Sequence, residues 1–498
     1  MAELFTFDVL SLLTIDNLLS VIFGTLFGMA VGAMPGLGPT VGVAIAMPIT
    51  YSMDILPAVL FLVALYQGAE YGGSISAITL GIPGAASASA TVIDGNSLAK
   101  KGFPGKALGY SLWASFSGGL LGGFVLLLFM APLARVAFKF SDPEMFLIAS
   151  FGLITIITLG SKDIPKSMVA LFIGLLLRTA GTDLLSGVER FTLDIPSMHE
   201  GFIFIAVVTG LFALSEVLNM SGGELGRPTV NNIENLKVSI SPKEYKPLIP
   251  TILKSSTIGT ILGIIPGLGP SAAAWVSYNE TKRSHPDKDF GNGEPLGIAS
   301  CESANNACVG GALLPLLAMG IPGSSTIAVL SSAFLMKGIQ PGPQILLKQP
   351  DLIYGILWGF IIAVLALLIL GKLFTTLTSR LLTVPNYLLL SIILVAIIIG
   401  SYGARNNIFD VYVALAIGIC SFILVKLDYP YPSFLMAFVL GDLIETSFRR
   451  SLTLSRGSYM IFLERPICVL LLVMIAALIA HSVYTAVKSR QNSAQKAI

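Results

Sequence analysis

The chain carries twice the stretch that decides its fold: first Pro35-Gly36-Leu37-Gly38-Pro39-Thr40, and later Pro266-Gly267-Leu268-Gly269-Pro270-Ser271. Each copy is followed by a second motif, Gly-Ile-Pro-Gly, at residues 81–84 and 320–323. Glycine and proline interrupt helices. Within lipid, such interruptions are tolerated only where neighbouring protein or a water-filled cavity satisfies the freed backbone groups. Paired interruptions at corresponding places in two halves are typical of the binding site of a transporter.

Composition argues against a soluble globular protein. Of 498 residues, 54% are hydrophobic and 12% are charged, and the mean hydropathy is +0.83, whereas soluble domains carry about 25% charged residues. Many windows contain the roughly 20 apolar residues that a membrane-crossing helix requires. The net charge of +2 comes with no single-signed region, so the sequence gives no indication of a nucleic-acid partner. We therefore expect a polytopic all-α integral membrane protein with broken or re-entrant helices.

The two motif pairs divide the chain into two homologous halves. We expect a first repeat at residues 1–222, a polar connector at 223–247 and a second repeat at 248–498. Each repeat is expected to contain a substrate-holding part with broken helices, followed by scaffold spans. In the first repeat the broken-helix part is 35–106 and the scaffold spans are 107–220. In the second repeat the corresponding ranges are 266–345 and 351–446. A last span at 466–487 has no counterpart in the first repeat. We expect the repeats to be inverted and the broken parts to move against the scaffold, as in an elevator transporter.

Four prolines mark fresh helix starts after the glycine breaks: Pro39, Pro83, Pro270 and Pro322. A helix N-terminus presents free N–H groups and a partial positive charge, so it binds anions without a buried lysine. The breaks therefore predict a carboxylate site, and structural kinks with tight packing are the alternative. The candidate substrate-binding residues are Gly36, Gly38, Pro39, Thr40, Gly84, Ser87, Gly267, Gly269, Pro270, Ser271, Asn305, Asn306, Gly323, Ser324 and Ser325.

Buried ionisable and amide residues indicate where a coupling ion binds. Glu302, Asn305 and Asn306 share one helix face because they lie three and four residues apart. A carboxyl at membrane depth is costly and usually faces a cavity or a partner. Glu302 is thus a candidate ion ligand or proton carrier, with a hydrogen-bonded structural carboxyl as the alternative. Gln67 and Glu70 are its rough first-half equivalents.

Backbone oxygens are further candidates for ion coupling. Unwound carbonyls beside the breaks suit Na⁺, a hard cation that favours oxygen ligands. The residues added on this ground are Gly72, Gly73 and Gly310. The choice between Na⁺ and H⁺ stays open, and no cofactor is expected.

Two other classes of function are considered. A passive anion channel would favour continuous pore-lining helices over duplicated breaks. An intramembrane enzyme would need a nucleophile with its base, or metal ligands; Val439-Leu440-Gly441-Asp442 approaches the Gly-x-Gly-Asp motif but lacks its first glycine. We therefore expect no enzyme.

Three local predictions follow from single segments or residue types. Asp94-Gly95-Asn96 predicts a turn. Arg178, near the end of a span, is expected to extend its charged group to the membrane interface. The four cysteines are interpreted as buried free thiols.

At these residues the chain resembles the large membrane subunit of the bacterial tripartite tricarboxylate transporters. The resemblance rests on the two glycine-proline motifs, the Asn305-Asn306 segment and the overall length. It implies a permease in the bacterial inner membrane, coupled to Na⁺ or H⁺, that imports di- and tricarboxylates such as citrate or other organic acids. It also implies a small membrane subunit and a periplasmic solute-binding protein as partners, besides the membrane lipid. Basic residues flank the last span on both sides, so charge does not assign the orientation.

Overall fold

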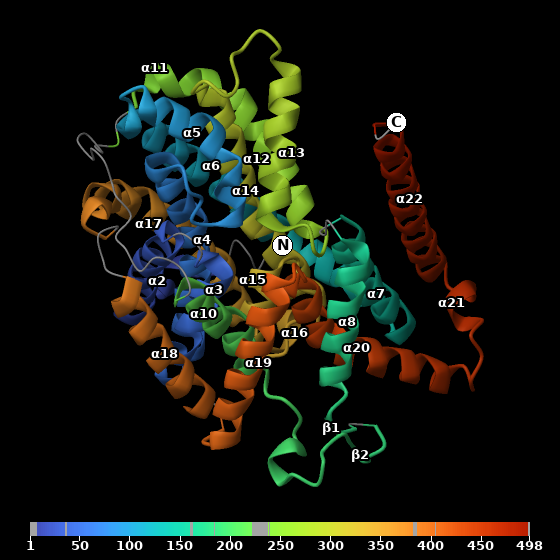
Figure 1. The fold of residues 1–498 in the computed structure, drawn as a ribbon. Coiled ribbons are helices and arrows are strands. Elements are labelled where there is room, and N and C mark those ends of the chain that lie inside the picture. Colours follow the sequence, from blue (N-terminus) through green and yellow to red (C-terminus); the bar gives the residue numbers. More distant parts are fainter. Residues whose placement is uncertain are drawn as a thin grey trace. The chain divides into compact units, whose positions relative to one another are not determined.

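A computed structural model describes the chain except for residues 1–6, 35–36, 160–162, 184, 222–237, 239, 382–385, 404 and 497–498. Helices make up nearly all of the regular structure (Figure 1), which confirms the expected all-α class. Within the described residues, strands are limited to the short antiparallel hairpin of β1 (Gly181–Thr182) and β2 (Glu189–Arg190). Seven helical segments of the described chain are long and apolar enough to cross a membrane.

The first half contains α2 (Ile15–Ala33), α3 (Gly38–Ala46), α4 (Ile55–Leu80), α5 (Thr91–Lys100), α6 (Pro104–Ala137), α7 (Asp142–Leu159), α8 (Ile164–Arg178), α9 (Phe204–Val208) and α10 (Ser215–Ser221). A π-helical turn at Thr209–Leu214 joins α9 to α10. Short 3₁₀ helices lie at Val9–Leu12, Met47–Ser52, Ala86–Ser89, Pro196–Met198 and Lys246–Leu248.

The second half contains α11 (Pro242–Tyr245), α12 (Ile249–Ile264), α13 (Gly269–Ser284), α14 (Pro295–Met319), α15 (Ser325–Met336), α16 (Ile345–Lys348), α17 (Pro350–Leu381), α18 (Asn386–Gly403), α19 (Ile408–Lys426), α20 (Tyr431–Leu454), α21 (Ile461–Glu464) and α22 (Pro466–Lys496). The predicted apolar spans thus coincide with helices.

The chain divides into two compact units. The larger comprises Met1–Arg135, Ile203–Ile265 and Gly269–Ile423, and the smaller comprises Val136–Phe202, Pro266–Leu268 and Leu424–Ile498. Both units take segments from both halves of the sequence, so this division differs from the predicted repeat boundary. The connector predicted at 223–247 lies mostly outside the described residues, and the repeat boundaries stay a prediction.

Glycines bring neighbouring helices of the larger unit into backbone contact. On α2, a side chain at Gly24, Gly28 or Gly32 would collide with a backbone carbonyl of α4. On α12, Gly259 and Gly263 face the backbone of α14 in the same way. Lipid tails are as apolar as leucine, so helices associate in a membrane through such close packing instead of through hydrophobic exclusion. The glycines of α2 and α12 therefore serve close packing against α4 and α14.

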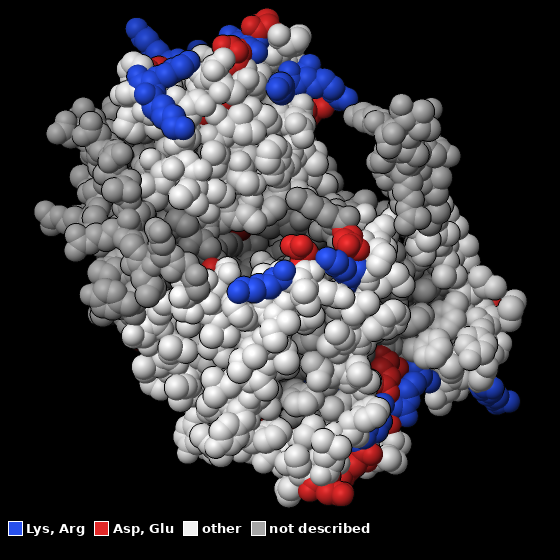
Figure 2. All heavy atoms as spheres, in the orientation of Figure 1, with Lys and Arg blue, Asp and Glu red and all other residues white. Residues whose placement is uncertain are grey.

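Charged side chains gather at one end of the larger unit, over α5, α11 and α13 (Figure 2). Ion pairs there include Lys106–Glu244 at 2.6 Å and Lys254–Glu280 at 2.8 Å. Large apolar side chains are exposed along the helices, as expected for a surface that faces lipid. Cys420 is exposed, so the prediction that all four cysteines are buried is wrong for this one.

The local structure differs from the sequence prediction in three respects. Pro83 and Pro322 were expected to start helices, but the helices that follow them begin at Ala86 and Ser325, so both prolines lie in the breaks. Asp94-Gly95-Asn96 was expected to form a turn but lies within α5, because Asp94 has partners far along the chain that hold the helix in place. Neither Gly72-Gly73 nor Gly310-Gly311 interrupts its helix, and α4 and α14 run through them without a break. These glycines admit the backbone of neighbouring helices. An ion-binding role for Gly72, Gly73 and Gly310 stays a prediction without support from an unwound backbone.

Candidate functional site

The two glycine-proline motifs adopt matching backbone conformations. Gly38 and Gly269 both have left-handed φ angles, +60° and +64°, immediately before the prolines that open α3 and α13. Gly81 and Gly320 end α4 and α14 with φ angles of +73° and +77°. Only glycine adopts this conformation at little cost. The matching angles explain why the motifs need glycine at these places.

Helices that follow the breaks meet across the two halves of the chain. The hydroxyls of Thr40 on α3 and Thr326 on α15 are hydrogen-bonded at 2.7 Å. In the reciprocal contact, Trp275 of α13 donates to Ser89 of the 3₁₀ helix Ala86–Ser89 at 3.0 Å. Segments that follow separate motifs are therefore brought together in space, and of these four residues Thr40 is the predicted site residue.

The start of α15 carries a helix cap. The Ser324 hydroxyl accepts the N–H of Ile327 at 3.3 Å and lies 3.2 Å from the Tyr66 hydroxyl of α4. Gly269, at the start of α13, lies beside Ser324. Ser324, the cap of α15, thus lies next to the start of α13. A helix N-terminus carries free N–H groups and a partial positive charge.

Glu70 of α4 is a buried carboxyl, 2% exposed. The Ser87 hydroxyl, which follows the first Gly-Ile-Pro-Gly motif, donates to its Oε2 at 2.5 Å. This bond ties the helix-break segment directly to the predicted ion-coupling residue. Ser87 was predicted as a substrate ligand, and the structure gives it this carboxyl as its partner.

Glu302 of α14 is fully buried. Its carboxyl accepts hydrogen bonds from the hydroxyls of Thr91 on α5 and Ser115 on α6, the latter at 3.1 Å. Neither Glu302 nor Glu70 has a Lys, Arg or His partner among the hydrogen bonds and ion pairs of the described residues. A carboxyl buried without a cationic partner is expensive to ionise. Such a group is therefore usually protonated or neutralised by a bound cation.

An amide bridge connects the two carboxyl regions. Gln67 of α4 donates from Nε2 to Asn306 Oδ1 of α14 at 2.8 Å, and Asn306 donates to Asn305 Oδ1 at 2.6 Å. Within the described part of the chain, Gln67 Oε1 and Asn305 Nδ2 are buried without a hydrogen-bond partner. One buried acceptor and one buried donor beside two carboxyls leave the network able to take up a further polar group.

Asp94 is a structural residue of this region that sequence reasoning missed. Its Oδ1 accepts the backbone N–H groups of Gly291, Gly293 and Glu294 at 2.8, 3.0 and 2.9 Å, and Tyr278 donates to Oδ2 at 2.9 Å. The carboxylate thereby holds α5 against α13 and the loop that leads into α14. No local signal could reveal this role, because every partner lies in the other half of the chain.

The remaining predicted site residues fall into three groups. Gly36 lies outside the described residues. Gly267 belongs to the smaller unit, where it packs against Ile156 of α7. The others lie at or next to the breaks: Gly38 and Gly84, which are neighbours; Gly323, which packs against Gly263; and Pro39, Pro270, Ser271 and Ser325, in the first turns of their helices. No cluster of three or more His, Cys, Asp or Glu suited to a metal ion occurs in the part of the chain that was described.

Comparisons with known proteins point to one family. The model of the tripartite tricarboxylate transporter TctA family matches residues 18–436. The chain is 35% identical over 456 residues to an uncharacterized 52.8 kDa protein in the TAR-I ttuC′ 3′ region of Agrobacterium vitis, an alignment that covers 91% of this chain and 90% of the relative. It is 38% identical over 215 residues to an uncharacterized protein in the TAR-II ttuC′ 3′ region of the same organism, covering 43% of this chain and 89% of that relative. Because the family model covers most of the described membrane helices, the chain belongs to the TctA family of tripartite tricarboxylate transporters, as a multi-pass membrane component.

Proposed function

We propose that the protein is the permease of a secondary transporter that imports organic carboxylates, such as citrate and other di- and tricarboxylates, across the bacterial inner membrane. Transport is driven by Na⁺ or H⁺ and depends on a periplasmic solute-binding protein and a small membrane subunit. Family membership supports the tricarboxylate class and a non-enzymatic role. The buried polar region of the larger unit supports the location of the site.

The single observation that carries the proposal is the contact between Thr40 and Thr326. This contact joins the first turns of α3, which follows the first Pro-Gly-Leu-Gly-Pro motif, and α15, which follows the second Gly-Ile-Pro-Gly motif. The first turn of a helix has free backbone N–H groups, and anions bind to such groups. Hydroxyl groups there donate to a carboxylate, and no Lys or Arg needs to be buried. The substrate is bound by the hydroxyls of Thr40, Thr326, Ser324 and Ser325 and by the backbone at the starts of α3, α13 and α15.

The coupling ion binds at the two buried carboxyls. Glu302, with Asn305 and Asn306, forms the second-half part of this site, and Glu70 with Gln67 forms the first-half part. The 2.5 Å bond from Ser87 to Glu70 supports a link to the break segment. A proton or a sodium ion that neutralises these carboxyls would alter the hydrogen bonds that hold the break segments in place.

The two halves are inverted repeats whose broken segments move together, as an elevator. The close glycine contacts of α2 with α4 and of α12 with α14 support the duplication, because they occur in corresponding places. Structures of inward- and outward-facing states test the movement. A substrate site that keeps its depth in the membrane while gates rock around it would contradict the elevator.

Replacing Thr326 with valine is expected to raise the KM for substrate about tenfold or more, because a hydrogen bond to a charged group is worth about 1.5–3 kcal/mol. The measurement is uptake of radiolabelled citrate into proteoliposomes, with and without a sodium or proton gradient and the binding protein. Thr257→Val is the matched control, since Thr257 is exposed and, within the described residues, its hydroxyl donates to the backbone oxygen of Leu253 at 2.9 Å. An unchanged KM in Thr326→Val and Thr40→Val would remove this site from the proposal.

A further inference from the structure

The segment between α8 and α9 is a compact loop with a fixed internal structure. Gly181 pairs with Arg190 and Thr182 with Glu189 in the β1–β2 hairpin. The returning chain is bound to it, because Thr182 N donates to His199 O at 2.8 Å. Asp183, Thr192 and Met198 are buried within the loop.

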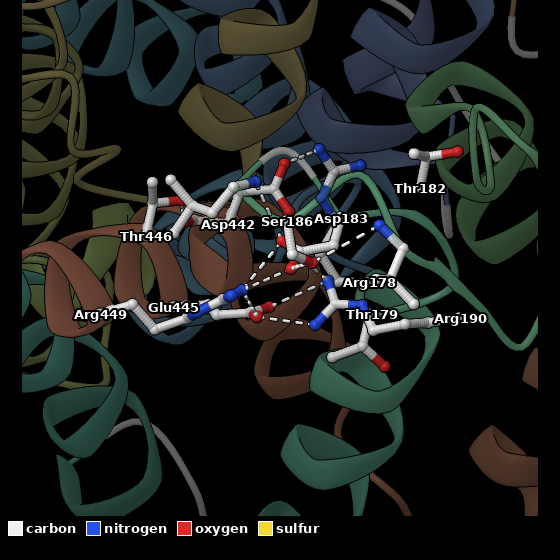
Figure 3. A network of polar contacts seen from close by, with 12 residues as sticks. Arg178, Thr179, Thr182, Asp183, Ser186, Arg190, Asp442, Glu445, Thr446 and Arg449 are labelled. Carbon is white, nitrogen blue, oxygen red and sulfur yellow. Dashed lines mark hydrogen bonds and ion pairs between the residues drawn. The ribbon is translucent and has the colours of Figure 1, made fainter.

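Ion pairs anchor this loop to α20 of the same unit (Figure 3). Arg449 of α20 contacts both carboxylate oxygens of Asp183 at 2.8 Å, and Arg190 of the loop pairs with Glu445 of α20 at 2.7 Å. Arg178, at the end of α8, pairs with Asp442 and so does not simply snorkel as expected. Hydrogen bonds from Ser186 and Arg449 hold the pKa of Asp183 well below its ordinary value. The Arg449–Asp183 pair is therefore intact at neutral pH and is lost only as the pH falls far below the usual aspartate range.

The anchored loop presents apolar side chains outward. Leu193 is 78% exposed and Phe191 63%, and they are accompanied by Leu185, Val188 and Ile195. Phe191 and Leu193 have φ angles of +54° and +52°, a conformation that bulky residues rarely adopt. The backbone thus stays in a costly conformation with its largest apolar groups uncovered, which is typical of a preformed contact surface.

The charges beside these apolar groups distinguish between possible occupants. Asp194 is exposed between Leu193 and Ile195, and Glu189 is half exposed, with His199 at 3.4 Å. The segment's own arginine, Arg190, is paired with Glu445. An acidic surface is repelled by anionic lipid headgroups, whereas it complements a protein surface that carries Lys and Arg around an apolar recess.

We propose that residues 185–195, the docking loop, form the contact surface for a water-soluble protein partner with an apolar recess bordered by basic residues. The proposal rests on the proposed function for the identity of that partner, the solute-binding protein. Leu193 and Phe191 fill the recess, and Asp194 and Glu189 meet the basic border. The Arg449–Asp183 and Arg190–Glu445 pairs hold the loop ready, so little ordering is needed on binding.

The first test is direct binding of the purified solute-binding protein to the permease and its small subunit in nanodiscs. Leu193→Asn is expected to weaken binding at least tenfold. Asparagine tolerates the left-handed conformation, so this variant removes the apolar group without adding strain. Leu10→Asn, at an equally exposed leucine of the larger unit, is the control. Equal affinity of Leu193→Asn and wild type would overturn the proposal.

The second test concerns charge. Asp194→Lys is expected to weaken binding several-fold, and the affinity of the wild type is expected to fall as salt rises, because exposed charges are screened. If neither Asp194→Lys nor higher salt changes the affinity, the proposed contact between the acidic residues of the loop and basic residues of the partner is wrong. A Leu193→Asn variant that binds normally but transports differently in different lipids would instead assign the loop to the membrane surface.

The third test locates the loop. Leu193→Cys, in a background where the exposed Cys420 is serine, is expected to react with a membrane-impermeant maleimide from the periplasmic side. The binding protein is expected to protect it. Labelling from the cytoplasmic side only would overturn the proposal. Because binding is measured without uptake, a failure of carboxylate transport by the wild type remains distinguishable from a failure of docking.

Discussion

Glu302→Gln is expected to abolish gradient-driven accumulation of substrate, while exchange of internal for external substrate continues. Glutamine has the size of glutamate, so the packing around α14 is retained. Its oxygen still accepts one of the two hydroxyl hydrogen bonds that Thr91 and Ser115 donate to Glu302, and its NH₂ group can donate to the other hydroxyl. It can neither lose a proton nor neutralise a cation. Coupling therefore fails while the substrate site survives, and the measurement is uptake by proteoliposomes under an imposed gradient, beside counterflow without one.

The controls for this prediction separate coupling from folding. Glu464→Gln changes an exposed glutamate and is expected to accumulate substrate normally. Glu70→Gln tests whether both carboxyls are needed or Glu302 alone. The gradient that drives the wild type, sodium or proton, identifies the ion. If Glu302→Gln accumulates substrate as the wild type does, the carboxyl is structural and coupling lies elsewhere.

Gly28→Ala and Gly259→Ala are each expected to destabilise the protein by about 3 kcal/mol or more. A Cβ at Gly28 would lie 2.8 Å from Leu65 Cα, and one at Gly259 2.8 Å from Ala304 Cα. The obstructing atoms belong to helix backbone and cannot rotate away, so the cost lies at or beyond the 1–3 kcal/mol of ordinary overpacking. Thermal unfolding in detergent, followed by the fraction of monodisperse protein, measures the effect.

Gly403→Ala is the matched control, because it also changes a helical glycine but has open space around the added atom. It is expected to be neutral or slightly stabilising, since alanine favours helix more than glycine does. Equal stability of all three variants would mean that α2–α4 and α12–α14 separate easily. That result would remove the close glycine contacts as the basis of helix packing.

The sequence predicted the membrane class and the places of the breaks because both depend on local properties. Hydropathy reports how a segment partitions into lipid, and the Pro-Gly pairs report where the backbone leaves the helix. It was less informative about Gly72-Gly73 and Gly310-Gly311. A glycine pair that breaks a helix and one that admits a neighbouring backbone look alike in sequence, and only the surroundings distinguish them.

Thus the sequence by itself determined the all-α membrane fold, the duplicated motifs, and Glu302 and Asn306 as buried candidates on one helix face. Tertiary structure alone decided which groups meet: Thr40 with Thr326, Gln67 with Asn306, and Asp94 with the loop before α14. It also decided that Arg178 pairs with Asp442. The physical reason is that these contacts join residues about 200 or more positions apart, and the pairing of distant polar groups depends on how the helices pack, which no local pattern records.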